Sequence, residues 1–194
     1  MKIGVLALQG AFIEHIRMLE SLGAEAVAVR KPEQLADLDG LVIPGGESTT
    51  IGKLANDYGL MEPLRDFARR KAVWGTCAGL IFMAKDIGID QQPILGLMDI
   101  TVDRNAFGRQ VDSFETALDI SGLGDEPFHA IFIRAPVVTE ADEGAGVKIL
   151  ARLEDGRIVA VRQNSWLGTA FHPELTGDAR LHRLFMEMVG ETTV

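Results

Sequence analysis

The chain has 194 residues, 47% of them hydrophobic and 24% charged, which is typical of one ordinary globular domain over residues 1–194. Its formal net charge of −9 argues against a nucleic-acid partner, because phosphates demand a basic face. The single cysteine excludes an internal disulfide. No segment approaches the roughly 20 apolar residues of a membrane span. Gln9 and Gly10 interrupt the N-terminal apolar stretch too early for a signal peptide. We therefore expect a cytoplasmic protein with no membrane partner.

The first half of the chain alternates predicted strands and helices. Apolar runs at 2–8, 24–30, 40–46 and 72–77 predict strands. Helices are predicted at 12–22, from Pro32, at 48–71 with breaks at Gly59 and Pro63, and from Ala78 to about Lys85. Continuous apolar strands are typical of a parallel sheet buried on both faces, and the alternation predicts right-handed crossovers.

The second half is richer in strands. They are predicted at 96–103, 113–120, 129–138, 147–154 and 157–163, with Asp155-Gly156 as a hairpin turn between the last two. A final amphipathic helix carries apolar residues from Leu181 to Val189. The predicted fold class is α/β: a doubly wound, mostly parallel sheet with helices on both faces and an antiparallel extension.

Cys77, the only cysteine, stands between Gly75 and Gly79 where a predicted strand turns into a helix. In open α/β sheets ligands bind beyond the carboxyl ends of strands. The G-x-C-x-G spacing matches the G-x-S-x-G nucleophile elbow with sulfur in place of oxygen, and a following helix favours the thiolate. A small buried hydrophobe is the alternative interpretation of a lone cysteine, and this motif alone leaves both open.

A thiol nucleophile needs a base and a group that orients the base. His172 and Glu174 in "FHPEL" point to one face if the segment is extended, so Glu174 can hold one imidazole nitrogen and leave the other for Cys77. A loop histidine beside a turn-forming proline is the alternative. For the other histidines, His15, His129 and His182, surface or packing roles are expected, and no histidine pair has metal-ligand spacing, so neither a metal nor a cofactor is predicted.

Acyl transfer also needs donors for the developing oxyanion. The "PGGES" turn (44–48) ends the third predicted strand at the same sheet edge as Cys77, and its glycines allow the backbone to aim N–H groups at a ligand. The amide of Ala78 can supply a second donor. The simpler interpretation is a glycine turn before a helix capped by Ser48, with Glu47 at the mouth of the pocket, suited to an ammonium group.

Together these elements resemble the class I (triad) glutamine amidotransferase family, and within it the glutaminase subunits of pyridoxal 5′-phosphate synthases. The resemblance covers nearly the whole chain. It is carried by "LALQGAFIEH" (6–15), "PGGESTT" (44–50), "GTCAGL" (75–80), "DRNAFGRQ" (103–110), "FIRAP" (132–136) and "GTAFHPEL" (168–175). No position expected to be catalytic departs from the pattern.

The resemblance implies that Cys77 attacks the side-chain amide of L-glutamine while His172, oriented by Glu174, moves protons. Ammonia leaves first, and water then cleaves the glutamyl thioester. Amides at Gly46 and Ala78 would form the oxyanion hole. The residues implied to line the glutamine site are Gly46, Glu47, Ser48, Arg104, Ile133 and Arg134. The two guanidinium groups suit the substrate carboxylate, although solvation at the surface would explain them equally well.

The resemblance also implies a partner: a separate (β/α)₈-barrel synthase subunit in a hetero-oligomeric complex, which receives the ammonia and builds pyridoxal 5′-phosphate. Free ammonia would take up a proton in water, so a useful glutaminase should turn over fast only with its partner docked. Gln9 and Gly10, after the first predicted strand, are the candidate partner-sensing residues, acting together with Gly45-Gly46, whose peptide can reorient at low steric cost.

Three rival functions remain open at the level of sequence. The first is a glutaminase that serves another synthase, in histidine or purine biosynthesis. The second is a non-catalytic binding or regulatory domain of the same fold, against which the intact Cys77, His172 and Glu174 argue. The third is a cysteine hydrolase of peptides or esters, which would share the elbow.

Overall fold

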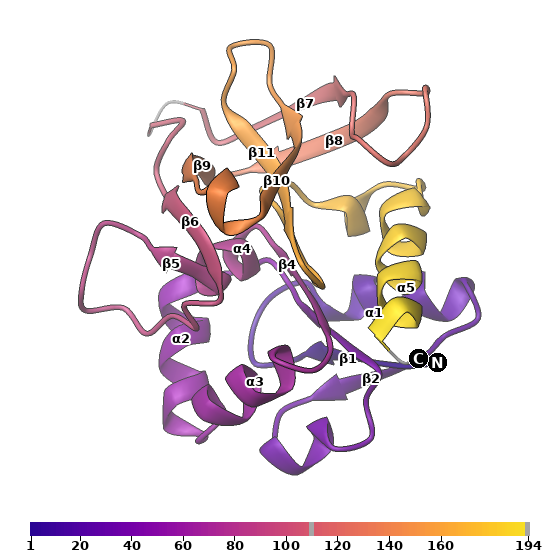
Figure 1. Cartoon of the computed structure of the whole chain (residues 1–194). Coiled ribbons are helices and arrows are strands. Elements are labelled where there is room, and N and C mark those ends of the chain that lie inside the picture. Colours follow the sequence, from indigo (N-terminus) through magenta and orange to yellow (C-terminus); the bar gives the residue numbers. More distant parts are fainter. Residues whose placement is uncertain (109–110, 193–194) are drawn as a thin grey trace.

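A computed structural model describes residues 1–108 and 111–192 (Figure 1). Its first half consists of the elements β1 (Lys2–Leu6), α1 (Phe12–Ser21), β2 (Glu25–Val29), the 3₁₀ turn η1 (Pro32–Leu35), β3 (Gly40–Ile43), α2 (Ser48–Asp57), α3 (Met61–Ala68), β4 (Ala72–Thr76) and α4 (Ala78–Met83). The predicted alternation of strands and helices over this half is therefore confirmed. Every residue of β3 and β4 is buried, as expected for strands covered on both faces.

The second half consists of β5 (Ala84–Asp86), β6 (Met98–Asp103), β7 (Ser113–Leu118), β8 (Phe128–Ile133), β9 (Val137–Ala141), η2 (Glu143–Ala145), β10 (Val147–Arg152), β11 (Ile158–Gln163), β12 (Trp166–Thr169), η3 (Pro173–Leu175) and α5 (Arg180–Thr192). The predicted hairpin at Asp155-Gly156 joins β10 to β11 in antiparallel register, with Gly156 at a φ of 88°. A positive φ is what this turn demands of its glycine.

One sheet runs in the order β2-β1-β3-β4-β12-β11-β9-β6-β5, with β10 added against β11. The strands from β2 to β12 pair in parallel, whereas β12–β11, β11–β9 and β9–β6 pair antiparallel. Figure 1 shows α2 and α3 on one side of the parallel strands and α1 and α5 on the other. The predicted doubly wound sheet with an antiparallel extension is thus confirmed.

The structure corrects the sequence prediction at several elements. The strand expected at 129–138 is two strands, because Arg134 has a φ of 43° and Pro136 has no N–H to donate. Within residues 1–108 and 111–192, β8 pairs with β7 alone, in a separate two-stranded sheet. The short strands β5 and β12 were not predicted. Pro63 does not break the helix, since it lies in the first turn of α3, where a missing N–H costs nothing.

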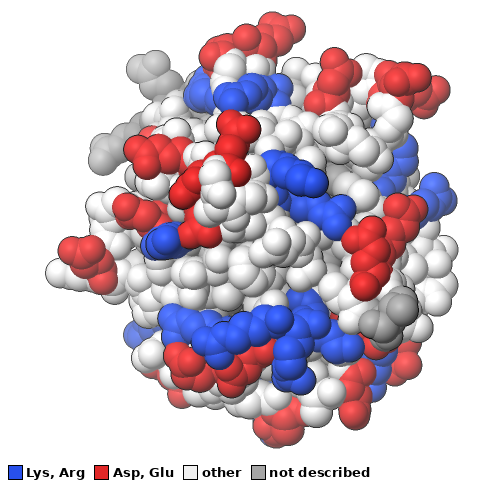
Figure 2. Space-filling view, viewed as in Figure 1, with Lys and Arg blue, Asp and Glu red and all other residues white. Residues whose placement is uncertain are grey.

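On the face in Figure 2, basic side chains form a band flanked by acidic ones, and no broad basic surface covers it.

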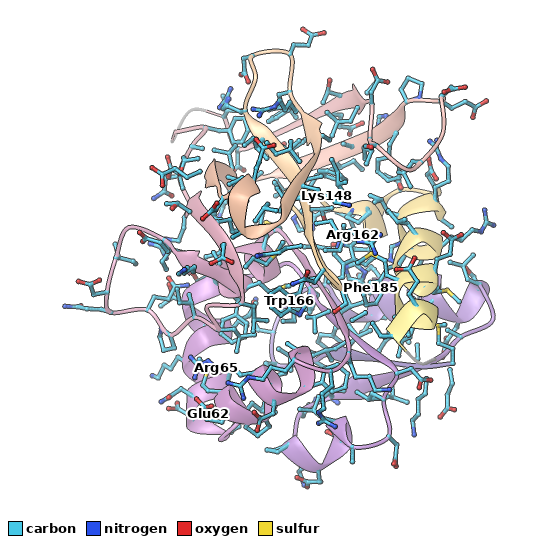
Figure 3. All side chains as sticks on the ribbon, in the orientation of Figure 1. Glu62, Arg65, Lys148, Arg162, Trp166 and Phe185 are labelled. Carbon is cyan, nitrogen blue, oxygen red and sulfur yellow. The ribbon has the colours of Figure 1, made fainter. Side chains whose placement is uncertain are left out.

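Arg65 of α3, labelled in Figure 3, donates to the carbonyl oxygens of Ile94 and Leu95 at 3.0 Å each and so holds the loop before β6. Among the described residues, no helix is both long and apolar enough to cross a membrane.

Candidate active site

Cys77 occupies a strained turn between β4 and α4. Its φ of 49° and ψ of −105° lie where non-glycine residues are uncommon. The flanking glycines make this turn possible: a Cβ on Gly79 would collide with the carbonyl oxygen of Ile43, and one on Gly75 would collide with the backbone of Gly79. Backbone strain of this kind is characteristic of functional sites, so the predicted elbow geometry is present.

The imidazole of His172 lies against Cys77, brought there by β12. This strand pairs with β4 in parallel and carries the chain to the same sheet edge. A Cβ added at Gly45 would lie 2.5 Å from His172 Cε1 and 3.3 Å from Cys77 Cβ, which shows how closely the two side chains share this space. The Cys77 thiol also donates to the carbonyl oxygen of Ile133, at 3.8 Å.

Glu174 holds the far side of the His172 ring. Its Oε1 lies 2.7 Å from His172 Nδ1, and both side chains are buried. The segment is not extended as the sequence suggested, because a 3₁₀ turn begins at Pro173. The pairing is made all the same, with His172 at the N-cap of this turn and Glu174 inside it. Cys77, His172 and Glu174 therefore stand in the order nucleophile, base and orienting group.

The surroundings of His172 favour its charged form. Burial alone would lower the pKa of the imidazole, but hydrogen bonds to Cys77 and Glu174, together with their charges, outweigh it and raise the pKa of His172 to about 10. Such an imidazolium at neutral pH is the natural partner of a thiolate. The arrangement therefore supports a nucleophilic sulfur rather than a structural one.

A cavity of about 590 Å³ opens over this triad. It is lined by all the predicted glutamine-site residues, Gly46, Glu47, Ser48, Arg104, Ile133 and Arg134, and also by Gln9, Thr49, Cys77, Ala78, Ile81, Asn105, Asp112 and His172. The fold thus brings together residues spread over more than 160 positions of the sequence. Asn105, Asp112 and Thr49 were not predicted, because nothing in their local pattern distinguishes them from ordinary turn residues.

The chain after β1 packs tightly on the glycine turn after β3. Gln9 Oε1 accepts a hydrogen bond from the backbone N–H of Glu47 at 2.7 Å. The carbonyl oxygen of Gly45 accepts one from the backbone N–H of Ala11 at 3.1 Å. A Cβ on Gly10 would collide with the Gly45 carbonyl, and one on Gly46 with the Gln9 amide oxygen. Gln9 and Gly10 therefore contact the very peptides from which an oxyanion donor was expected.

Glu47, not Ser48, caps helix α2. Its two carboxylate oxygens accept the backbone N–H groups of Thr49 and Thr50, at 3.1 and 2.7 Å. Partial burial raises the pKa of Glu47, but the hydrogen bonds from Thr50 and Thr49 outweigh it and lower the pKa overall. The longer side chain reaches the second and third amides of the helix, so Ser48 is left as a buried residue of its first turn.

The two predicted carboxylate-binding arginines already have partners. Arg104 Nη1 donates to Gln92 Oε1 and, at 3.4 Å, to Thr49 Oγ1. Arg134 is 81% exposed at its side chain and forms an ion pair with Asp112 at 2.7 Å. Arg104 is thus held by a buried glutamine, whereas Arg134 is an exposed side chain that lines the cavity.

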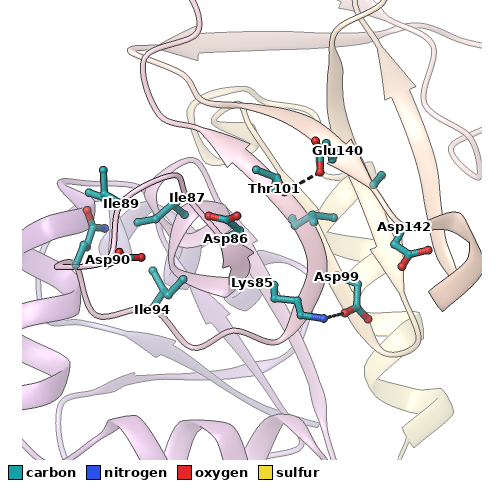
Figure 4. A pocket seen from close by; sticks show the side chains of 13 residues that line it. Lys85, Asp86, Ile87, Ile89, Asp90, Ile94, Asp99, Thr101, Glu140 and Asp142 are labelled. Atoms are coloured by element: carbon teal, nitrogen blue, oxygen red, sulfur yellow. Dashed lines mark hydrogen bonds and ion pairs between the residues drawn. The ribbon is translucent and has the colours of Figure 1, made fainter.

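A larger cavity of about 770 Å³ lies elsewhere, between β5, β6 and β9 (Figure 4). Among the groups that line it, Lys85 Nζ lies 2.8 Å from Asp99 Oδ1, and Thr101 donates to Glu140 at 3.4 Å. None of the triad residues lines it. In the described part of the chain, no three His, Cys, Asp or Glu side chains are grouped as metal ligands would be.

The remaining histidines separate into one at the surface and two in the interior. His129 is exposed and pairs with Glu115, a surface role as expected. His15 and His182 are completely buried, with His15 Nδ1 2.9 Å from His182 Nε2 and His15 Nε2 3.4 Å from Glu174 Oε2. Packing roles were among the expectations for this pair, but a polar contact with the triad was not predicted.

Comparison with known proteins agrees with this geometry. Residues 5–191 match the SNO glutamine amidotransferase family. The chain belongs to that family. The matched span includes the elbow, the glycine turn after β3 and the His172–Glu174 pair.

Curated relatives of this glutamine amidotransferase are similar over nearly their whole length. One, from Herpetosiphon aurantiacus, is 60% identical over 190 residues, which cover 96% of this chain and 99% of that protein. Another, from Geobacillus kaustophilus, is 60% identical over 192 residues, covering 98% and 96%. Both are named "Pyridoxal 5'-phosphate synthase subunit PdxT".

Solved structures extend the likeness to the fold. A crystal structure of a glutamine amidotransferase superposes with a TM-score of 0.91 at 53% identity, covering 97% of this chain and 98% of that one. The glutaminase domain of a Trypanosoma brucei protein with bound acivicin gives a TM-score of 0.61 at 15% identity, covering 98% and 94%. The second likeness concerns the fold alone.

Proposed function

We propose that this chain hydrolyses L-glutamine to L-glutamate and ammonia, and that it delivers the ammonia to the synthase subunit of a pyridoxal 5′-phosphate synthase. The observation that carries the proposal is that Cys77 and His172 line one cavity while Glu174 holds His172 from behind, in a chain about 60% identical to synthase subunits of that name. The partner would be a (β/α)₈ barrel in a hetero-oligomeric complex. A catalytic thiol must stay reduced, which favours the cytoplasm.

In this proposal Cys77 is the nucleophile. Its thiolate attacks the side-chain carbonyl carbon of glutamine. The oxyanion that forms accepts hydrogen bonds from the N–H groups of Gly46 and Ala78. The N–H of Ala78 is the first of helix α4, so it has no acceptor within the helix. Donors placed where charge develops typically lower such a barrier by about 3–4 kcal/mol each.

His172 moves the proton in both halves of the reaction. As an imidazolium it protonates the amide nitrogen, so that ammonia leaves and a glutamyl thioester remains on Cys77. The neutral imidazole then takes a proton from water, which attacks the thioester carbon and expels the thiolate. Glu174 holds Nδ1–H throughout, at 2.7 Å, and so fixes the ring and its tautomer.

Arg104 is the proposed partner of the substrate's carboxylate. It lies inside the cavity wall, and Gln92 and Thr49 hold it in place, whereas Arg134 is more exposed. Backbone groups of Ile133, together with Gly46, Glu47 and Ser48, complete the proposed glutamine site. Gln9 and Gly10 are the proposed sensors of the partner, because they contact the Gly45 and Gly46 peptides directly.

The deciding experiment is steady-state release of glutamate and ammonia from glutamine, with and without the synthase subunit. Glutamine-specific hydrolysis supports the proposal. Absence of hydrolysis in the complex would point to the non-catalytic domain, and turnover of simple esters or peptides in preference to glutamine would point to a general cysteine hydrolase. Ammonia transfer to a histidine or purine synthase instead would leave the triad standing but change the partner.

A further inference from the structure

Behind the triad, the two buried histidines continue its chain of polar contacts. His15 comes from α1 and His182 from α5, 167 positions apart, and both side chains are fully buried. His15 Nδ1 lies 2.9 Å from His182 Nε2, while its Nε2 lies 3.4 Å from Glu174 Oε2 and 3.3 Å from Thr76 Oγ1. The order is therefore His182, His15, Glu174, His172, Cys77.

Both rings are uncharged at neutral pH. Burial lowers the pKa of His182 to about 4. Burial, together with the imidazoles of His182 and His172, lowers the pKa of His15 well below its usual value. Each ring therefore carries one N–H, which lies on either Nδ1 or Nε2.

One arrangement of these two protons suits the surroundings better than the other. If His15 donated from Nδ1, its bare Nε2 lone pair would face the Glu174 carboxylate, and His182 would carry its N–H at Nδ1, which has no hydrogen-bond partner among the described residues. A buried, unpaired N–H is costly. With the protons on Nε2 of both rings, His182 donates to His15, and His15 directs its N–H toward Thr76 and Glu174.

Glu174 Oε2 needs such a neighbour. Its other oxygen is taken by His172, and Oε2 itself is buried without a hydrogen-bond partner in the described part of the chain. A buried carboxylate oxygen with nothing to compensate its charge is among the most expensive groups in a protein interior. The N–H of His15, 3.4 Å away, lies within reach to compensate it.

We propose that His15, set in its Nε2–H tautomer by His182, is a positioning residue for the triad: its N–H steadies the Glu174 carboxylate, which in turn orients His172. The kinetic consequence rests on the proposed glutaminase activity, whereas the structural consequence does not. A rigid second layer of hydrogen bonds is what holds reacting groups within the small tolerances that catalysis needs.

The test compares two variants at position 15. His15→Gln keeps an N–H near the position of the imidazole Nε2, whereas His15→Leu has similar bulk and no donor. A matched control is His129→Leu, because His129 is exposed and does not line the cavity. The readouts are kcat and KM for glutamine in the complex with the synthase subunit, and the proton NMR resonance of His172 Nδ1–H in the free chain.

We expect His15→Leu to lower kcat about tenfold or more, the loss typical when a partner one layer behind a reacting group is removed, with a smaller change in KM. The His172 resonance should shift, and His15→Gln should restore most of both. If Leu and Gln lose activity equally, or if the resonance does not move in His15→Leu, His15 is only a packing residue and the proposal is wrong.

Two further outcomes are separated by design. If the wild-type complex does not hydrolyse glutamine, the proposed function fails, but the His172 resonance still reports whether His15 acts on Glu174. If His15→Leu does not fold, His182→Leu replaces it, because losing the His182 donor frees His15 to change tautomer. A His172 resonance shift is expected in that variant also, and an unmoved resonance would overturn the proposal.

Discussion

At the scale of single residues, Cys77 combines three properties that a packing cysteine does not need. Its backbone is strained, its thiol contacts a histidine with a raised pKa, and it borders a cavity. A buried structural thiol is served equally well by a relaxed turn. The strain is explained if the fold must lift the sulfur clear of the sheet.

Replacing Cys77 with Ala should abolish glutamine hydrolysis and leave the fold intact, because so small a side chain contributes little packing. The measurement is ammonia release by the complex, with circular dichroism as the check on folding. A glutamine-like alkylating reagent should label the wild-type chain at Cys77 alone. Turnover near the wild-type level in Cys77→Ala would refute the assignment of the nucleophile.

Glu174→Gln keeps the shape of the orienting group and removes its charge. In the serine-protease template the equivalent change costs roughly 10⁴-fold in kcat. We expect a smaller loss here, and one smaller than that of Cys77→Ala, because a thiol ionises more easily than a hydroxyl. The ranking is measured by kcat in parallel assays, and equal losses in the two variants would contradict it.

The proton on His172 predicts a pH effect. Because its pKa is raised from 6.5 to about 10, the folded state holds the proton more tightly than the unfolded chain. The contribution of this proton to the stability of the folded state is fully present below about pH 6.5 and is lost as the pH rises toward 10. Cys77→Ala removes two of the causes of the shift, so the pKa of His172 should fall. An NMR titration of the ring protons measures it, and an unchanged pKa would show that Cys77 does not contribute.

At the scale of elements, the junction of β4 and α4 is held by backbone packing. Gly79 lies against the Ile43 carbonyl of β3, so the helix approaches the sheet more closely than any side chain at that position would allow. The distance between α4 and β3 therefore sets where Cys77 sits relative to the glycine turn after β3.

Gly79→Ala should push α4 away from β3, at a cost of about 1–3 kcal/mol in unfolding free energy, as for other overpacking changes, and with loss of glutaminase activity. Gly177→Ala is the control, since a Cβ there has nothing within 4 Å and the backbone is not left-handed. Denaturant unfolding and ammonia release are the measurements. Equal stability of the two variants would mean that the close packing at Gly79 is not required.

At the scale of the whole molecule, Gln9 of the proposed partner sensor lines the same cavity as Cys77 and His172. The Gln9 side chain accepts a hydrogen bond from the N–H of Glu47, which is one residue from the proposed oxyanion donor at Gly46. A partner that docks over β1 and the glycine turn after β3 can therefore change the orientation of this peptide without moving the triad. Such a device would keep ammonia from being released into water.

The isolated chain should accordingly be a poor glutaminase, and the synthase subunit should raise its kcat. Gln9→Ala should impair this activation more than it impairs glutamine binding, because the Gln9 side chain contacts the glycine turn rather than the triad. The measurement is steady-state hydrolysis titrated with synthase, alongside glutamine affinity. Equal turnover with and without the partner would exclude gating and leave the triad unaffected.

The parallel half of the fold and the nucleophile turn could be predicted from the sequence, because apolar runs, glycine spacing and the His172-Pro173-Glu174 stretch are local signals. How distant segments meet could not be predicted in this way. β12, too short to predict, carries His172 to the side of β4; the backbone of Arg134 divides one predicted strand between two sheets; and His15 meets His182 and Glu174 across the chain. Local periodicity carries no information about such contacts, since they depend on which strands become neighbours and which helices cover them.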